Sequence, residues 1–199
     1  MAGTARLEAI LAATANQGKF EEIRRCIGDA FAACLSLADF HEKVEVVEDR
    51  PTYYENAWKK ARKVGDRFGI PTLADDSGLE VEALHGSPGI YSARYGANDQ
   101  ERVDRLLGEL DGVPLERRAA RFKAYLVYYL PRMGQTFMFY GALKGYIGFA
   151  RRGGNGFGYD PVFMLPESGR ALSELSLEEK NEVSHRGQAL ARFRKFLGA

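Results

Sequence analysis

The sequence has little cysteine, no long apolar run and almost no net charge. Two cysteines, Cys26 and Cys34, are too few for a disulfide framework, and their spacing fits no zinc-binding pattern. No stretch approaches the roughly 20 apolar residues of a membrane helix, and the first residues lack the basic-then-apolar layout of a signal peptide. The 28 basic and 27 acidic residues nearly cancel, which argues against a nucleic-acid-binding face. We therefore expect a cytoplasmic protein that binds neither membranes nor nucleic acid.

Apolar residues and glycine are what the sequence has in quantity. Of the 199 residues 45% are hydrophobic, which is enough for a sizeable core. No internal repeat or linker divides the chain, so we expect a single domain over residues 1–199. The 22 glycines among 199 residues are a share of about 11%, above the average of about 7%. Several of them lie in one glycine-rich loop, Gly153–Gly158.

Hydrophobic periodicity predicts an alternation of strands and helices. Strands are expected at Leu7–Ala13, Lys43–Val47, Pro71–Ala74, Arg121–Leu130 and Gln135–Phe149, the last two forming an antiparallel pair. Helices are expected after Gly18, over Ala57–Phe68, over Asp99–Leu110 and from about Ser184. This order predicts an α/β protein with a mixed sheet flanked by helices.

The segment Thr14–Lys19 lies between the first predicted strand and the first predicted helix. Backbone N–H groups at a helix start favour phosphate. Thr14 and Asn16 add side-chain donors, and Lys19 adds a positive charge. The segment is not a Walker A loop, because Gly18-Lys19 lacks the upstream glycine and the following Ser or Thr. The alternative is that Asn16 only caps the helix.

The segment Asp75-Asp76-Ser77-Gly78 follows the predicted strand Pro71–Ala74. Two adjacent carboxylates raise each other's pKa unless a cation lies between them, and Mg²⁺ suits a site that also holds substrate phosphates. Glu48 and Glu55 are further carboxylates for such a shell. The alternative is a surface turn, because Asp-x-Ser-Gly turns are common.

The loop Asn155–Pro161 has glycines on both sides of Phe157. They let the backbone approach a flat ligand while the ring stacks on a base, and Asp160 can accept hydrogen bonds from a base or a ribose. The alternative is a tight turn around a core Phe.

Ser184 is the expected N-cap of the last helix, which places His185 and Arg186 in its first turn. Basic side chains there oppose the helix dipole, which indicates a negative or acceptor-rich ligand. The basic run Lys59–Lys63, by contrast, is expected on the solvated face of its helix.

Six segments, in this order, resemble the inosine triphosphate pyrophosphatase family. They are Thr14-x-Asn16-x-x-Lys19, Glu55-Asn56-Ala57-x-x-Lys60-Ala61, Ala74-Asp75-Asp76-Ser77-Gly78-Leu79, Pro88–Tyr95, Gly156–Pro161 and Ser184-His185-Arg186. The resemblance covers roughly residues 10 to 190 and implies an elongated α/β fold, a Mg²⁺ requirement and a homodimer. It also implies hydrolysis of ITP, dITP and XTP to the monophosphate and pyrophosphate.

The resemblance further implies roles for individual residues. Asp76 takes the position of the proton acceptor and metal ligand, and Glu48 that of a second metal ligand. The substrate-binding positions are Thr14, Ala15, Asn16, Gln17, Gly18, Lys19, Ser77, Phe157, Gly158, Tyr159, Asp160, Lys180, His185 and Arg186. This chain departs from the family at Ala15, where glycine is usual, and before Thr52, where a Glu-Thr-Gly-like stretch is usual. Asp49 therefore remains an alternative to Glu48, and Asp75 an alternative to Asp76, as metal ligand.

Two other functions remain open: hydrolysis of modified pyrimidine or ordinary nucleoside triphosphates, and nucleotide sensing without turnover. Asp75 and Asp76 together with Lys19 argue against a sensor, since a binder has less need of a metal and a base together.

For base choice, inosine and xanthine carry a 6-keto oxygen where adenine carries an amino group. His185 and Arg186 can donate to that oxygen, so we expect them to read it.

Overall fold

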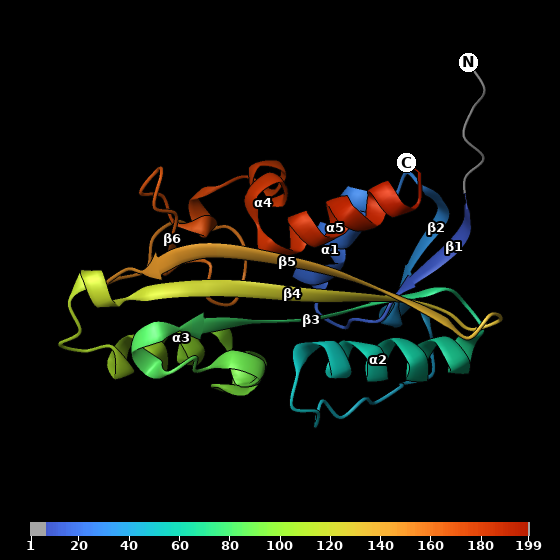
Figure 1. Cartoon of the computed structure of the whole chain (residues 1–199), viewed down its shortest axis with the longest axis horizontal. Helices are drawn as coiled ribbons and strands as arrows, with labels where there is room; N and C mark the ends of the chain where they lie inside the picture. Colours follow the sequence, from blue (N-terminus) through green and yellow to red (C-terminus); the bar gives the residue numbers. More distant parts are fainter. Residues whose placement is uncertain (1–6, 199) are drawn as a thin grey trace, which may run out of the picture. The chain divides into compact units, whose positions relative to one another are not determined.

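Residues 7–198 are described by a computed structural model, in which six strands form one mixed sheet of order β2-β1-β3-β4-β5-β6 (Figure 1). The strands are β1 (Leu7–Ala12), β2 (Phe31–Ser36), β3 (Thr72–Val81), β4 (Ala119–Leu130), β5 (Gln135–Ile147) and β6 (Phe163–Met164). The α-helices are α1 (Gln17–Ile27), α2 (Tyr53–Phe68), α3 (Asp99–Glu109), α4 (Leu177–Val183) and α5 (His185–Phe196). β1 pairs in parallel with β2 and β3, whereas β5 pairs antiparallel with β6. The predicted α/β class with a mixed sheet is confirmed.

The chain divides into two compact units. The first unit contains the described residues up to 76, with 124–141 and 186–198; the second contains 77–123 and 142–185. The expected single domain over residues 1–199 stays a prediction. No helix within residues 7–198 is both long enough and apolar enough to cross a membrane.

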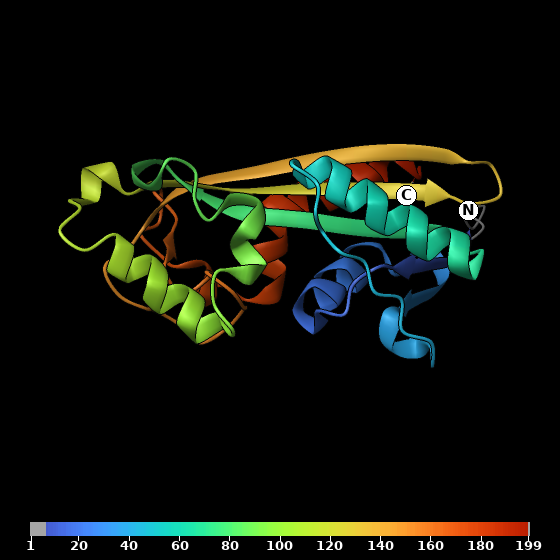
Figure 2. The same ribbon diagram turned by 90° about the horizontal axis from the view of Figure 1, so that it is seen from below.

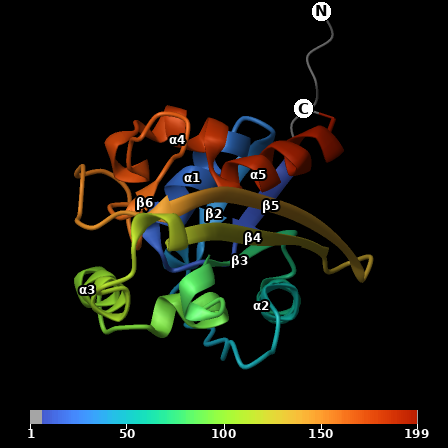
Figure 3. The ribbon, with the colours of Figure 1, turned by 60° about the vertical axis from the view of Figure 1, so that its left-hand side comes forward.

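The sheet of the first unit is covered by helices on both faces. Side chains alternate along β1, so Ile10 points into one core and Leu11 into the other. The core around Ile10 takes apolar residues from α1 and α5, and the core around Leu11 takes them from α2. Accordingly, α1 and α5 lie on one face and α2 on the opposite face (Figure 3), and α2 crosses the strands when seen from below (Figure 2).

The second unit has one core, in which α3 packs against β3 and β4. Val103 and Leu106 of α3 are buried together with Leu79 of β3 and Phe122 of β4. The Phe122 ring lies 4.6 Å from that of Phe163 in β6, measured between centroids. This core anchors the loops that precede and follow α3.

Sequence reasoning was right about most elements. It did not predict the two-residue strand β6, and it differs from the structure in the following further places. The predicted strand at Lys43–Val47 is irregular, and its alternating Val44 and Val46 pack from a loop onto the core around Leu11. β2 and the short helix α4 were not predicted. The predicted strand ending at Ala74 continues through the acidic segment to Val81 as β3, so that segment is not the surface turn of the alternative interpretation.

Candidate functional site

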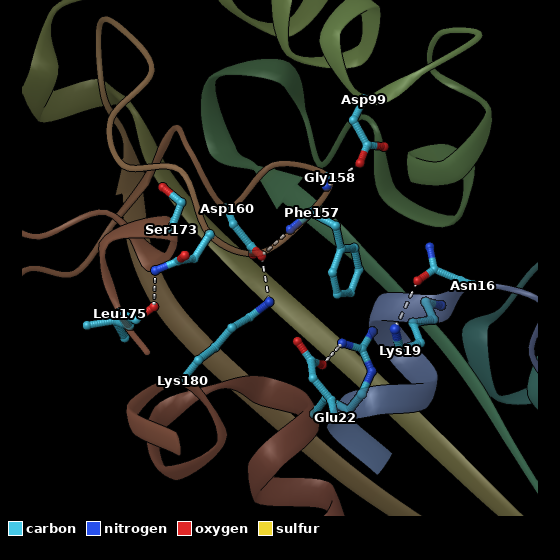
Figure 4. Close-up of polar contacts among 12 residues, drawn as sticks. Asn16, Lys19, Glu22, Asp99, Phe157, Gly158, Asp160, Ser173, Leu175 and Lys180 are labelled. Carbon is cyan, nitrogen blue, oxygen red and sulfur yellow. Dashed lines mark hydrogen bonds and ion pairs between the residues drawn. The ribbon is translucent and has the colours of Figure 1, made fainter. Parts of the chain in front are cut away.

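The predicted phosphate loop connects β1 to α1 in the first unit. Asn16 is the N-cap of α1, and its side-chain oxygen accepts a hydrogen bond from the Lys19 N–H at 2.9 Å (Figure 4). The Thr14 hydroxyl accepts the Asn16 N–H at 3.1 Å. The loop is accessible, since Ala15, Asn16 and Gln17 are exposed. The capping role of Asn16 is therefore present, and it leaves an exposed helix N-terminus of the kind that binds phosphate.

Asp75 and Asp76 point to opposite faces of β3. Successive side chains alternate along a strand, and in β3 Leu73 joins the core with α1 and α5 whereas Ala74 joins the core with α2. Asp75 continues the first series and Asp76 the second. The expected mutual repulsion is present, since Asp75 raises the pKa of Asp76, but it is not the largest cause, and the two pKa values shift in opposite directions because the surroundings of the two side chains differ.

Asp75 is enclosed by positive charge. One carboxylate oxygen lies 2.6 Å from the Lys19 ammonium and 3.2 Å from the Arg186 guanidinium, and the side chain is 0% exposed. Arg186 also forms an ion pair with Glu22 of α1, and both side chains are buried. Burial alone would raise the pKa of Asp75, but Arg186, Lys19 and Lys60 outweigh it and hold that pKa well below its ordinary value. Asp75 therefore stays ionised and fixes the position of Lys19.

Asp76 has the opposite character. Its burial raises the pKa of the carboxyl group to about 7, with the neighbouring carboxylates of Glu48 and Asp75 adding to the effect and Lys60 and Lys19 opposing it. One of its oxygens is buried and has no hydrogen-bond partner among residues 7–198. A carboxyl group that titrates near neutral pH and keeps an oxygen for a ligand suits a general base or a metal ligand.

Lys60 of α2 connects the acidic strand to the loop that carries Glu48. Its ammonium donates to the Asp75 carbonyl oxygen at 3.0 Å and forms an ion pair with the Glu48 carboxylate. The expectation that the run Lys59–Lys63 lies in solvent is wrong for Lys60, whose side chain is only 14% exposed. The motif Glu55-x-x-x-x-Lys60 was the available signal, but nothing in its spacing indicates the partners.

The segment between Glu48 and α2 is fixed by a buried side chain that sequence reasoning missed. Asn56 is 0% exposed. Its amide accepts the Arg50 N–H at 2.9 Å and donates to the Arg50 carbonyl at 3.2 Å. Asp49 instead forms an ion pair with Lys59 at 2.7 Å. Glu48, and not Asp49, is among the charges that raise the pKa of Asp76. Which of the two would bind a metal stays a prediction.

Glu55, the other carboxylate considered for the metal shell, caps α2. Its side chain accepts the Thr52 hydroxyl at 2.7 Å, while the Thr52 hydroxyl accepts the Glu55 N–H at 3.2 Å. Within residues 7–198 no group of three or more His, Cys, Asp or Glu side chains has the arrangement of a metal site. Mg²⁺ is commonly held by one or two carboxylates with water and substrate phosphates. The buried oxygen of Asp76 and the neighbouring Glu48 fit that smaller requirement.

In the second unit, the segment Asn155–Pro161 that was predicted to receive the nucleobase lies in an irregular stretch, of which we call residues 153–160 the Phe157 loop. Gly156 has φ +78°, and a Cβ there would lie 2.2 Å from an Asp160 oxygen, so no larger residue fits. That Asp160 carboxylate accepts the Phe157 N–H at 2.9 Å and lies 2.5 Å from the Lys180 ammonium, which is 4.5 Å from the Phe157 ring centroid (Figure 4). Phe157 is only half-buried, unlike a core Phe.

The remaining residues predicted at the base end have partners within their own unit. The Tyr159 hydroxyl donates to the Ser92 carbonyl at 2.9 Å, which joins the Gly156–Pro161 segment to Pro88–Tyr95. The buried His185 ring stacks on Phe122 at 4.6 Å between centroids. As predicted, α5 begins at His185, immediately after Ser184. Contacts of Ser77, Lys180, His185 and Arg186 with substrate stay predictions.

A buried carboxyl group of raised pKa, flanked by lysines and accompanied by a strand-to-helix phosphate loop, is typical of an enzyme that hydrolyses phosphate anhydrides. Comparison with known proteins agrees. The chain belongs to the Ham1 family, which matches residues 10–196.

Relatives and solved structures of this family cover nearly the whole chain. A dITP/XTP pyrophosphatase of Geobacter sulfurreducens is 46% identical over 192 residues, covering 95% of this chain and 96% of the relative. One from Thermus thermophilus is 46% identical over 183 residues, covering 91% and 87%. The HAM1 protein of Coxiella burnetii superposes with a TM-score of 0.85 at 34% identity, covering 96% and 99%. The resemblance drawn from the sequence is thus confirmed.

Proposed function

We propose that this chain hydrolyses non-standard purine nucleoside triphosphates, namely ITP, dITP and XTP, to the monophosphate and pyrophosphate. Relatives named dITP/XTP pyrophosphatase cover more than nine-tenths of the chain. The single structural observation that carries the proposal is Asp76, a buried carboxyl group with a pKa raised to about 7 and an oxygen without a hydrogen-bond partner in the described chain. A protein that only sensed nucleotides would have little need of such a group.

In the proposed reaction a water molecule attacks the α-phosphorus, and the bond to the bridging oxygen of the β-phosphate breaks. Asp76 orients this water and accepts its proton. Lys19 and the N-terminus of α1 hold the leaving pyrophosphate, whose charge grows as the bond breaks. Asp75 keeps the Lys19 ammonium in place through their 2.6 Å ion pair.

The chemistry calls for a divalent cation, which we propose to be Mg²⁺ held by Asp76 and Glu48. When bound, Mg²⁺ neutralises charge that develops on the phosphate oxygens. The side chain of Glu48 is 22% exposed, so a hydrated ion can reach it. The carboxylate of Asp75 suits a metal less, because it is already paired with Lys19 and Arg186.

Base recognition is assigned to the Phe157 loop. Its half-buried ring offers a stacking surface, and the glycines around it let backbone groups approach a flat ligand. The Asp160 oxygen that binds the Phe157 N–H is already engaged with Lys180, so its main effect is on the shape of the loop.

The direct test is to incubate the protein with Mg²⁺ and each of ITP, XTP, dITP, ATP and dUTP and to measure pyrophosphate release. We expect turnover of the first three at a kcat/KM at least about a hundredfold above that for ATP, because unpaired buried donors penalise the wrong base strongly. Binding of ITP without release of pyrophosphate would favour a sensor, and preference for dUTP or ATP would favour the broader hydrolases. Asp76→Asn provides the inactive control.

A homodimer in the cytoplasm belongs to the same proposal. The dimer rests on the family alone. The tyrosines of the β4–β5 hairpin offer no separate support, because Tyr128 and Tyr129 are buried in the two cores of the first unit and Tyr125 stacks against Tyr53 and Tyr140. Sedimentation at micromolar concentration decides it, and a species of one chain mass would contradict it. The cytoplasm is where nucleoside triphosphates are used.

A further inference from the structure

We infer that Asp99 is a positioning residue that fixes the Phe157 loop and thereby sets the affinity for the nucleobase. The inference rests on the proposed function, in which this loop receives the base. Asp99 lies far from the loop in sequence and outside all six segments that resemble the family. Its role is visible only in the folded second unit.

The Phe157 loop has no regular secondary structure to hold its shape. Gly153, Gly156 and Gly158 all have positive φ, at +73°, +78° and +60°, and the loop contains neither strand nor helix. Residues 153–156 are exposed. Glycine allows these positive φ angles but does not impose them, since it adopts many other conformations equally well. The shape of the loop therefore depends on hydrogen bonds to its backbone, some made within the loop by Asp160 and others from outside it, by Ser173 and Asp99.

Two carboxylates hold consecutive amides at the tip of the loop. The Phe157 N–H donates to Asp160 at 2.9 Å, and the Gly158 N–H donates to Asp99 at 2.7 Å (Figure 4). Each carboxylate has its own cation: Lys180 lies 2.5 Å from Asp160, and Arg102 lies 2.6 Å from Asp99. Hydrogen bonds to an ionised acceptor are the stronger kind. Together they fix the two peptide groups on either side of Phe157, and so the direction in which its ring points.

Asp99 can act as a fixed point because of where it lies. It is the first residue of α3, directly after the N-cap Asn98, which accepts the Glu101 N–H at 2.9 Å. The same helix is anchored by Val103 and Leu106, which are 1% and 0% exposed in the core of the second unit. The 2.7 Å bond thus joins the tip of the loop to a helix that is itself anchored in the core of the second unit.

The competing explanation is that Asp99 only stabilises α3, since an acidic residue in the first turn complements the helix dipole. Asp99→Asn and Asp99→Ala separate the two explanations. Both remove the charge, but only asparagine keeps an oxygen that can accept the Gly158 N–H. Arg102→Ala is the matched control, because it breaks the ion pair and leaves the Asp99 carboxylate in place.

The experiment measures loop order and catalysis in the full-length protein. Amide hydrogen exchange at Phe157 and Gly158, followed by NMR, should accelerate about tenfold or more in Asp99→Ala and much less in Asp99→Asn and Arg102→Ala. KM for ITP should rise about tenfold in Asp99→Ala, corresponding to about 1.4 kcal/mol, while kcat changes less than twofold. Inhibition by inorganic tripolyphosphate, which has no base, should be unchanged.

Three results would overturn the inference. They are unchanged exchange in Asp99→Ala, an Asp99→Asn variant as impaired as Asp99→Ala, and a tripolyphosphate inhibition constant that worsens in parallel with KM. The last two are what loss of helix stability alone predicts. Failure of the wild-type protein to hydrolyse ITP would instead refute the proposed function, and the exchange rates would still decide whether Asp99 orders the loop.

Discussion

Replacing Asp76 by asparagine should remove most of the hydrolytic activity and, at the same time, stabilise the folded chain at neutral and alkaline pH. Burial raises the pKa of Asp76 from its ordinary value of 3.8 to about 7, although Lys60 and Lys19 oppose the rise. A proton therefore binds this carboxyl group more tightly in the folded chain than in the unfolded chain. The stability gained from that proton is fully present below pH 3.8 and is lost as the pH rises through about 7.

The size of the effect follows from the pKa difference of about three between the two states. Each factor of ten in proton affinity is worth 1.36 kcal/mol, so the ionised carboxylate destabilises the fold by at most about 4 kcal/mol at pH 8. At pH 5 the same reasoning gives about 2 kcal/mol, and at pH 3 close to zero. Asparagine carries no charge at any of these pH values, so the variant avoids the whole penalty. Against a typical domain stability of about 5–15 kcal/mol, the gain is large.

The assay is urea unfolding of wild type and Asp76→Asn at pH 5 and pH 8, followed by the fluorescence of Trp58. This is the only tryptophan in the sequence, and it lies in the same unit as Asp76. Asp75→Asn is the matched control: Arg186 and Lys19 hold the pKa of Asp75 low against its burial, so its loss should destabilise the fold at pH 8. Mg²⁺ should stabilise the wild type and have little effect on Asp76→Asn.

The two neighbouring substitutions should therefore change stability in opposite directions. An Asp76→Asn protein that unfolds at the same urea concentration as wild type at pH 8, or at a lower one, would refute the reasoning about its burial. Turnover of ITP at a near wild-type rate would refute its catalytic role. General-base loss alone should reduce the rate by about 10²–10⁴.

Three further substitutions test the rest of the site. Lys19→Ala should weaken binding of a triphosphate more than of a monophosphate. Equal losses of affinity in titrations with both ligands would show that Lys19 does not bind the outer phosphates. Glu48→Gln should raise the Mg²⁺ concentration for half-maximal activity about tenfold, whereas Asp49→Asn should not, because Asp49 pairs with Lys59. Asn56→Ala should lower the free energy of unfolding by about 1–3 kcal/mol, since it leaves the backbone of Arg50 without its two bonds; an unchanged urea midpoint would contradict that role.

Elements with strong periodicity could be predicted because their local signals agree with their burial. α2 ends where Gly69 adopts φ +67°, as a helix closed by glycine should, and α3 buries Val103 and Leu106 as its spacing requires. β2 was not predicted from the sequence because Phe31–Ser36 contains mainly small residues, most of them partly exposed. α4 was not predicted because its seven residues are mostly polar, and among them only Lys180 is buried. In such segments tertiary contacts, not propensity, decide the structure.

The acidic segment shows why a local pattern can identify a site and still misplace it. Asp75 to Gly78 has the composition of a turn, yet it forms the middle of β3 because its charges are matched from other elements. Asp75 forms an ion pair with Lys19. Lys60 donates a hydrogen bond to the Asp75 carbonyl and forms an ion pair with Glu48. Two carboxylates adjacent in sequence face opposite sides of a strand, so one becomes a permanent anion and the other a group that titrates near pH 7.

The buried contacts of Arg186 determine how its predicted role in base choice can be tested. A basic residue in the first turn of a helix indicates a negative partner, and Arg186 has two, Glu22 and Asp75, which lie 164 and 111 residues away in sequence. Its removal would take the guanidinium away from Glu22 and Asp75, both of which are buried, although Asp75 would keep its ion pair with Lys19. Breaking a buried ion pair typically costs about 3–5 kcal/mol, and Asp75, and with it Lys19, would be held less firmly in place. Loss of activity in an Arg186 variant is therefore expected whether or not the guanidinium contacts a base. The ratio of kcat/KM for ITP to that for ATP cancels this shared loss, because both substrates carry the same triphosphate, and so it reports base recognition alone.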